Sequence, residues 1–278
     1  MIELRRQHSL CDLLKVAGLS RSTFYYQHKV LQLVDKYAEV KDRIRQIYAQ
    51  HKGCYGYRRI TATLRLKGGS INHKTVQRLM GDLQLKSCVR LKRYRSYRGE
   101  IGHVAPNVLA RNFAACSPNE KCVTDVTEFK VGSEKLYLSP IMDLFNGEIV
   151  SYEIARRPLF NMVAKMLTSA FQRLGPCDKP ILHSDQGWQY RMDRYRRHLK
   201  LRSITQSMSR KGNCLDNAAM ESFFGTLKSE YFHLTNFTCL DELKTGLDEY
   251  IRYYNIDRIK LKLGCLSPVD YRMQFMSQ

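Results

Sequence analysis

The sequence contains no long hydrophobic run. Among its 278 residues, no uninterrupted apolar stretch approaches the roughly 20 residues that a membrane-spanning helix needs. The first six residues, MIELRR, lack the apolar core of a signal peptide. We therefore expect a cytoplasmic protein, whose hydrophobic content of 44% suffices for an ordinary globular core.

Paired cysteines are also missing. The chain has nine cysteines, but no two form a C-x-x-C pair, and no His-x3–5-His partner exists for a zinc site. The count is odd and the chain is long, so a disulfide framework is not indicated. We expect free and mostly buried thiols.

Acidic residues are scarce, above all in the first part of the chain. The formal net charge is +20. Residues 1–115 hold 23 Lys and Arg against 7 Asp and Glu, whereas residues 116–278 hold 23 against 19. One explanation of this positive excess is ordinary surface charge in contact with water. An imbalance of this size favours a nucleic-acid-binding module attached to a catalytic domain, and no lipidation signal or basic amphipathic anchor supports membrane binding.

Two helix-turn-helix patterns occupy the basic part. In residues 9–28 a short helix meets Gly18, and a second helix starts at a Ser20 cap. This second helix would present Arg21, Ser22, Thr23 and Tyr26 to DNA; a small helical hairpin is the alternative. An amphipathic pattern then predicts one long helix over residues 31–51.

The second helix-turn-helix pattern covers residues 58–85, with Asn72 as the cap of its second helix. Along one side that helix offers His73, Lys74, Gln77 and Arg78. Lys and Arg would contact phosphates, while Gln77 and Arg78 could read base edges. Residues 86–98 mix Tyr94 and Tyr97 with basic side chains, namely Arg90, Lys92, Arg93, Arg95 and Arg98, which suits an arm along a DNA backbone or a solvated linker.

The remaining chain alternates strands and helices. We predict strands at 121–131, 136–143, 148–154, 180–184 and 203–207, and helices at 161–174 and 190–199. The first three strands form an antiparallel meander with a hairpin at Asn146–Gly147. The fourth follows a helical crossover and would lie parallel to one of them. The fold class is therefore α/β, with a mixed five-stranded sheet and flanking helices.

Three carboxylates stand out in this pattern. Asp125 lies in the middle of the first predicted strand, Asp185 ends the fourth, and Glu221 lies on a helix predicted to start at an Asp216 cap. Between Asp185 and Glu221 there are 35 residues, 186 to 220. Carboxylates without His or Cys suit hard ions such as Mg²⁺ or Mn²⁺. The alternative is that these three carboxylates only stabilise the fold and bind no metal.

Several runs resemble the DDE transposase and retroviral integrase superfamily. They are VTDVTEF around Asp125, HSDQG around Asp185, and Glu221 followed by Lys228 seven residues later. Residues 207–218 and 254–268 resemble one branch, the second-frame (OrfB) transposases of the bacterial "insertion sequence three" family. The run GYRRI at 56–60 resembles the N-terminal helix-turn-helix region of that family, so the resemblance covers essentially the whole chain.

The resemblance implies an RNase H-like catalytic core with two Mg²⁺ ions, held by Asp125, Asp185 and Glu221. It implies nicking at the ends of an insertion sequence, followed by attack of the freed 3′-hydroxyl on another phosphodiester. Residues 209–213 would form a mobile loop. The expected DNA contacts are Arg58, Arg59, Lys74, Gln77, Arg78, Arg93, Arg95, Arg210, Lys211, Asn217 and Lys228.

The resemblance also implies partners and boundaries. Double-stranded DNA is the substrate, a homo-oligomer on DNA is expected, and a first-frame protein (OrfA) can supply another helix-turn-helix and a leucine zipper. We expect a helix-turn-helix-like segment at 1–30, a DNA-binding region at 31–98, a linker at 99–118, the core at 119–235 and a helical extension at 236–278. Alternatives are a DNA-binding accessory that is inactive without its first-frame partner, and a plain RNase H-type nuclease.

Some positions depart from the family or compete with the three acids. Cys122 stands where Trp is frequent, and Lys260 where some members have His. We expect His183 to support or pack beside Asp185 and Asp143 to serve a turn. Trp188 would stack on a base or pack in the core.

Overall fold

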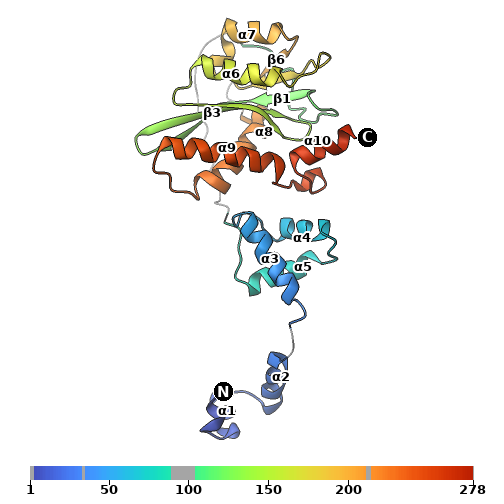
Figure 1. Ribbon diagram of the computed structural model, residues 1–278, viewed down its shortest axis with the longest axis vertical. Helices are drawn as coiled ribbons and strands as arrows, with labels where there is room; N and C mark the ends of the chain where they lie inside the picture. The colour runs from blue at the N-terminus through green and yellow to red at the C-terminus, as the bar shows by residue number, and fades with distance from the viewer. Residues whose placement is uncertain (1–2, 33–34, 89–103, 211–213, 278) are drawn as a thin grey trace.

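A computed structural model describes residues 3–32, 35–88, 104–210 and 214–277, and of residues 30–32 and 214–215 it describes the backbone alone. These residues form a helix pair, a three-helix unit and an α/β body (Figure 1). The predicted contacts Arg93, Arg95 and Lys211 lie outside the described residues.

The helix pair has the predicted helix-turn-helix shape. Its elements are η1 (Glu3–Arg6), α1 (Leu10–Ala17) and α2 (Arg21–Gln32). Gly18 ends α1 in the left-handed conformation, with φ of 62°. The Ser20 hydroxyl accepts a hydrogen bond from the Thr23 amide at 3.1 Å, which confirms the predicted cap of α2.

The three-helix unit consists of α3 (Ala38–Gln50), α4 (Tyr57–Leu66) and α5 (His73–Asp82). The Asn72 side chain caps α5, as predicted. The single helix predicted over 31–51 is wrong, because α2 ends at Gln32 and α3 begins at Ala38. The Asp35 carboxylate accepts a hydrogen bond from the Tyr37 amide at 2.9 Å, which stabilises a turn before α3.

The sheet of the α/β body has six strands: β1 (Lys121–Thr124), β2 (Thr127–Val131), β3 (Glu134–Asp143), β4 (Ile149–Ala155), β5 (Ile181–Ser184) and β6 (Thr205–Met208). β3 pairs with β4 on one side and with β1 and β2 on the other. β5 lies parallel to both β1 and β6, so the predicted parallel pairing is confirmed.

The predicted count of five strands differs from six because the first strand is interrupted. Thr124 faces Ile141. Thr127, three residues later, faces Leu138, three residues before Ile141, so β1 and β2 keep one antiparallel register along β3. Asp125 and Val126 form the gap between them. The predicted position of Asp125 in mid-strand is therefore wrong: it stands at a break.

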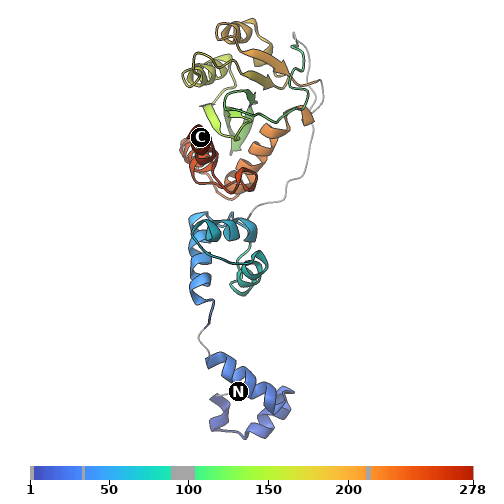
Figure 2. The ribbon, with the colours of Figure 1, turned by 90° about the vertical axis from the view of Figure 1, so that its right-hand side faces the viewer.

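Helices cover both faces of the sheet (Figures 1 and 2). α6 (Phe160–Phe171) and α7 (Asp193–Lys200) pack on the face that includes Cys122 and Leu182. α8 (Ala218–Leu227) and α9 (Leu240–Ile256) pack on the face that includes Val123 and Phe129. Because consecutive strand residues point to opposite faces, Cys122 and Val123 enter different cores. This is the α/β RNase H-like arrangement that we expected.

Two segments outside the predicted core boundaries pack into the body. Leu109, in the predicted linker, is buried in the same cluster as α8 and α9. The Met208 amide of β6 donates a hydrogen bond to the Pro106 carbonyl at 3.3 Å. In the predicted extension, α9 contributes Leu243, Leu247 and Tyr254 to this cluster. The boundaries at 118 and 235 stay predictions, but no change in packing marks them.

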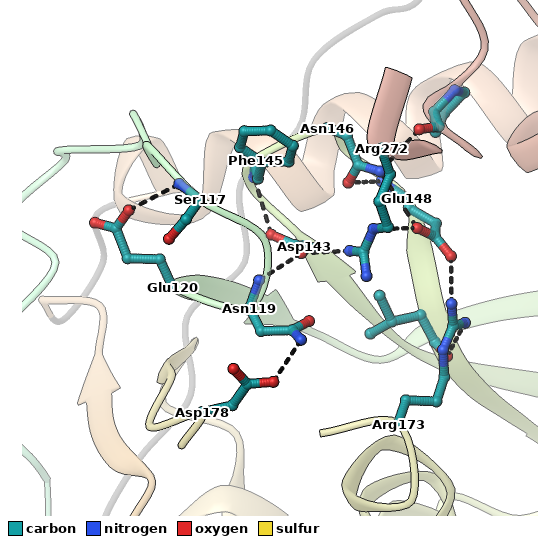
Figure 3. A network of polar contacts seen from close by, with 12 residues as sticks. Ser117, Asn119, Glu120, Asp143, Phe145, Asn146, Glu148, Arg173, Asp178 and Arg272 are labelled. Atoms are coloured by element: carbon teal, nitrogen blue, oxygen red, sulfur yellow. Dashed lines mark hydrogen bonds and ion pairs between the residues drawn. The ribbon is translucent and has the colours of Figure 1, made fainter. Parts of the chain in front are cut away.

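The extension also holds the hairpin between β3 and β4 (Figure 3). Arg272 of α10 (Pro268–Met276) pairs with Asp143 and Glu148, both fully or almost fully buried. Asp143 further accepts the backbone amides of Asn119 and Phe145, each at 2.9 Å. Asp143 thus has the turn role that we expected, together with an ion pair.

The cysteines differ from the prediction in their burial. The cysteines with described side chains are free thiols, but only Cys54 and Cys122 are buried. The expectation of mostly buried thiols is wrong, because most of these cysteines lie in loops and on exposed helix faces.

Within the described ranges, no helix is long and apolar enough to cross a membrane.

Candidate active site

The break between β1 and β2 positions Asp125. Its Oδ1 atom accepts a hydrogen bond from the Val126 amide at 2.7 Å. That amide no longer donates to a neighbouring strand, so the local bond and the break in the ladder occur together. Asp125 therefore follows the last paired residue of β1, Thr124, at one edge of the sheet.

Asp185 reaches the same edge from β5. Thr124 is the pairing partner of Ser184 in the parallel β1–β5 ladder, so Asp125 and Asp185 follow neighbouring residues. The Gly187 amide donates to Asp185 Oδ1 at 2.9 Å. A Cβ atom on residue 187 would lie 2.9 Å from that oxygen, so a larger residue there would displace the Asp185 carboxylate.

Glu221 comes from the opposite side, on the first turn of α8. The Asn217 side-chain amide donates to the Thr124 carbonyl at 3.3 Å and so ties the start of α8 to the end of β1. Asn217 and Glu221 are four residues apart and share one helix face. Glu221 is partly exposed, and in the described part of the chain it has no hydrogen-bond or ion-pair partner.

The three carboxylates act on one another electrostatically. Burial raises the pKa of Asp125 well above its usual range, and the charges of Asp185 and Glu221 raise it further, while Lys228 acts in the opposite direction. Burial also raises the pKa of Asp185, against the Gly187 amide and the charge of Arg191. Burial is thus the main cause of both shifts, and neighbouring negative charge adds to the shift of Asp125.

The donor atoms at this edge suit a hard cation. Among the described residues, no three His, Cys, Asp or Glu side chains are close enough to enclose an ion as they stand. However, Asp125 and Asp185 each accept a hydrogen bond from a backbone amide through Oδ1, and the buried Asn217 Oδ1 has no partner among the described residues. These oxygens match Mg²⁺ or Mn²⁺.

His183 lies two residues before Asp185 and is fully buried. Its Nδ1 is 2.8 Å from the Ser207 hydroxyl, and its Nε2 is 3.1 Å from the Ser209 hydroxyl. Both ring nitrogens are thus occupied, as expected for a residue that supports Asp185. Trp188 is 50% exposed, so packing in the core does not account for it.

Asp216 is fully buried and does not cap α8, contrary to the prediction. It accepts hydrogen bonds from Asn107 Nδ2 at 3.0 Å, Arg111 Nε at 2.8 Å, and the backbone and guanidinium of Arg210 at 3.0 Å. These bonds, the largest from Arg210, hold the pKa of Asp216 well below its usual range despite burial. The cap prediction failed because the carboxylate has stronger cationic donors than a helix amide.

Sequence reasoning thus missed Asp216 and Arg111 as anchors of the loop before α8. The available signal was a lone acid beside Arg210 and Lys211 in a basic loop. It does not identify Arg111, which lies 105 residues earlier.

The predicted DNA contacts fall in different surroundings. Lys74, Gln77 and Arg78 are exposed on one side of α5, and Arg58 is exposed on α4. Arg59 instead bonds to the buried Glu230 at 3.3 Å. The Lys228 ammonium lies 5.1 Å from the centre of the Phe129 ring, and its charge lowers the pKa of Asp125.

Comparison with known proteins agrees with this arrangement. Two family models described as "Integrase core domain" match residues 115–214 and 221–276, and one described as "HTH-like domain" matches residues 36–94. InsK of insertion sequence element IS150 from Escherichia coli is 60% identical, over 98% of this chain and 96% of its own length. The chain belongs to the insertion-sequence transposases.

Other relatives extend the match. The transposase for insertion sequence element IS904 of Lactococcus lactis is 33% identical, over 84% of this chain and 92% of its own length. Among solved structures, the catalytic core domain of HTLV-2 integrase in complex with magnesium is 18% identical with a TM-score of 0.44, and covers 56% of the transposase and 97% of that core.

Proposed function

We propose that the transposase cuts and joins DNA strands at one metal-dependent site, with Asp125, Asp185 and Glu221 as the metal ligands. The observation that carries the proposal is the parallel β1–β5 pairing, because it brings Asp125 and Asp185 to one sheet edge. The bond from Asn217 to Thr124 adds Glu221 from α8. Two Mg²⁺ ions, or Mn²⁺ in their place, are the proposed cofactors.

Each part of the site has a role in this proposal. The bound ions supply charge that stabilises the attacking and leaving oxygens of an in-line displacement. Asp125 and Asp185 would hold the ions together with Glu221, and the amides of Val126 and Gly187 fix one oxygen of each aspartate. Water attacks phosphorus in the first reaction and the P–O3′ bond breaks. In the second reaction the freed 3′-hydroxyl attacks the phosphorus of another phosphodiester, whose own P–O3′ bond breaks and leaves a new 3′-hydroxyl.

DNA contacts outside the acids are proposed from exposure and charge. Lys74, Gln77 and Arg78 lie on the exposed side of α5, where Lys and Arg suit phosphates and Gln suits a base edge. Asn217 and Lys228 border the acids. Arg210 would contact DNA only by giving up some of its bonds to Asp216.

The proposed assembly is a homo-oligomer on DNA, because joining acts on paired element ends. A first-frame protein is a further proposed partner. The transposase for insertion sequence element IS1353 of Shigella flexneri is 42% identical over 97% of this chain, yet the match covers 53% of that relative. That relative therefore contains additional sequence in which such a function can reside.

Strand transfer with oligonucleotides that carry the element ends tests the proposed function. With Mg²⁺ present, we expect Asp185→Asn to abolish both nicking and joining while DNA binding persists. Asp241→Asn is the matched control, because Asp241 is 82% exposed on α9 and pairs with the exposed Arg156. Nicking that survives the loss of each of the three acids would refute the proposal. Binding without any cleavage by the unaltered chain would favour the accessory role.

A further inference from the structure

A groove separates α4 of the three-helix unit from the open face of α8. It has a volume of about 610 Å³ and is lined by Tyr57 and Arg58 on one side and by Glu221, Ser222 and Gly225 on the other. We call it the α4–α8 groove. One of the three proposed metal ligands therefore faces the helix-turn-helix unit of its own chain.

A second hollow extends the groove towards α5. It has a volume of about 600 Å³ and is lined by Arg58, Arg65 and His73. Arg58 and Leu261 line both hollows, so the two are continuous at these residues. The path runs from His73, the first residue of α5, past Arg58 to Glu221.

The charges along this path favour a polyanion. Arg58 is exposed, and among the described residues it has no carboxylate partner; its Nε bonds to the Tyr57 hydroxyl at 3.2 Å. The Arg65 guanidinium donates to the Ile71 carbonyl, at 2.9 and 3.1 Å, and within the described part of the chain no carboxylate pairs with it. The hydroxyl of Ser222 is exposed on the opposite wall.

The two walls are fixed to each other by a buried ion cluster. Glu230 also lines the groove, but it accepts two bonds of 2.7 Å from Arg258, one of 3.3 Å from Arg59 and one of 3.1 Å from the Tyr250 hydroxyl. Burial would raise the pKa of Glu230, but these bonds and charges outweigh it and keep that pKa below its usual value.

Further contacts hold the three-helix unit against the α/β body, and we call this interface the joint. The Ile259 amide donates to the Tyr55 hydroxyl at 3.0 Å, and His51 Nδ1 is 3.1 Å from the Tyr253 hydroxyl. Figure 2 shows the three-helix unit beside α8 and α9. The unit that carries the predicted base-reading helix is therefore held against the acidic helix of the same chain.

We propose that the α4–α8 groove carries the sugar–phosphate backbone of one DNA strand from α5 to the acids of the same chain. Reading and cutting of an element end then occur in cis, and Arg58 contacts a phosphate between the two sites. This inference rests on the proposed function, since it takes Glu221 as part of the cutting site. Electrostatic contact with phosphates needs no base sequence along the groove.

The phosphate contact is measured first, through the salt dependence of DNA binding. Arg58→Ala should reduce the slope of log affinity against log salt by about 0.7–0.9, the value of one lost phosphate contact. Arg58→Lys should restore the slope, because lysine binds phosphate as a point charge. Arg156 is exposed, pairs with Asp241 and lines neither hollow, so Arg156→Ala should leave the slope unchanged. An unchanged slope for Arg58→Ala would overturn the inference.

Mixed chains distinguish cis from trans. Arg58→Glu blocks the groove but keeps the acids, and Asp185→Asn removes an acid but keeps the groove. Both are purified, checked for a folded-state melting transition, mixed in equal amounts and assayed for nicking of a single element end with Mg²⁺. Cis delivery predicts no nicking beyond that of either variant alone. A mixture of the unaltered chain with Asp185→Asn should keep its nicking activity, which shows that mixed chains are tolerated.

Recovery of nicking in the mixture of Arg58→Glu and Asp185→Asn would overturn the inference, because a groove on one chain would then serve the acids of another. The proposed function would stand in that case, since Asp185→Asn alone is inactive. Nicking by Asp185→Asn alone would instead refute the proposed function and the inference that rests on it.

Discussion

The side chain of Asn217 donates a hydrogen bond to the carbonyl oxygen of Thr124 at 3.3 Å. This bond joins the start of the acidic helix α8 to the strand end that precedes Asp125. It directly links two parts of the proposed site that are 93 residues apart along the chain.

Loss of this link should slow cutting more than it weakens DNA binding. A single hydrogen bond contributes about 0.5–1.5 kcal/mol, so Asn217→Ala is expected to lower the rate of nicking by roughly 2- to 12-fold through misplacement of Glu221. The measurement is kcat and KM for nicking with saturating Mg²⁺. Equal rates for the variant and the unaltered chain would contradict a positioning role for Asn217.

Removal of the Asp125 charge should stabilise the metal-free protein. Burial and the charges of Asp185 and Glu221 raise the pKa of Asp125, so its ionised form is unfavourable in the fold. Asp125→Asn is expected to raise the melting temperature by about 2–4 °C for each kcal/mol relieved. Mg²⁺ should raise the melting temperature of the unaltered chain and not that of the variant. A lower melting temperature for the metal-free variant would argue against this account.

A methyl group at residue 187 should disturb the Asp185 carboxylate. Its carbon would lie 2.9 Å from Asp185 Oδ1 and 3.0 Å from Gln189 Nε2. Gly187→Ala is therefore expected to lower metal-dependent nicking about tenfold, which corresponds to roughly 1.4 kcal/mol. Gly175→Ala is the control, since the nearest atom, Asp178 Oδ2, is 3.6 Å away. If the nicking rate fell equally in both variants, the loss could not be attributed to displacement of the Asp185 carboxylate.

The ion cluster at Glu230 should dominate the stability of the joint between the helix-turn-helix unit and the body. Glu230→Gln leaves the buried Arg258 without its carboxylate, and breaking such a pair costs about 3–5 kcal/mol. Urea unfolding followed by circular dichroism measures this change. Glu249→Gln serves as the comparison, because Glu249 is exposed on α9 and takes no part in the Glu230 cluster. A loss below about 1 kcal/mol would show that the pair is not a main support of the joint.

His51 should make the same joint sensitive to acid. Its ring stacks on Tyr55 at 3.7 Å, and burial lowers its pKa from 6.5 to about 4. Between these pH values the unfolded chain binds more protons than the folded chain, so stability falls as the pH decreases from 6.5 to about 4.

Urea midpoints across this pH range check the effect of His51. His51→Gln should show a smaller loss of stability on acidification, because glutamine does not titrate. The exposed His8→Gln should behave like the unaltered chain. Parallel curves for the His51 variant and the unaltered chain would exclude His51 as the cause.

Much of the catalytic body could be predicted from local sequence signals. Apolar runs and turn residues located the strands, and the helical crossover before β5 predicted its parallel pairing, because a crossover returns the chain in the same direction. That pairing in turn placed Asp125 and Asp185 at one edge. The interruption of the first strand was not predictable, because it depends on a bond from the Val126 amide to the preceding side chain.

The limits of sequence reasoning were set by long-range charge pairing. Asp216 looked like a helix cap because it precedes α8, but Arg111 and Arg210 reach it from other segments. The long helix predicted at 31–51 failed for a local reason, since the periodic apolar pattern continues through a turn that Asp35 stabilises.

By itself, the sequence determined the order of the elements, the position of Asp185 at the end of β5 and the basic character of the first part of the chain. These follow from patterns between near neighbours. Only the tertiary structure decided which charges remain available to DNA. Arg58 and Arg59 are adjacent, yet Arg58 is exposed in a groove whereas Arg59 pairs with Glu230, 171 residues away. A buried carboxylate must be compensated, and the fold alone determines which arginine is near enough to do so.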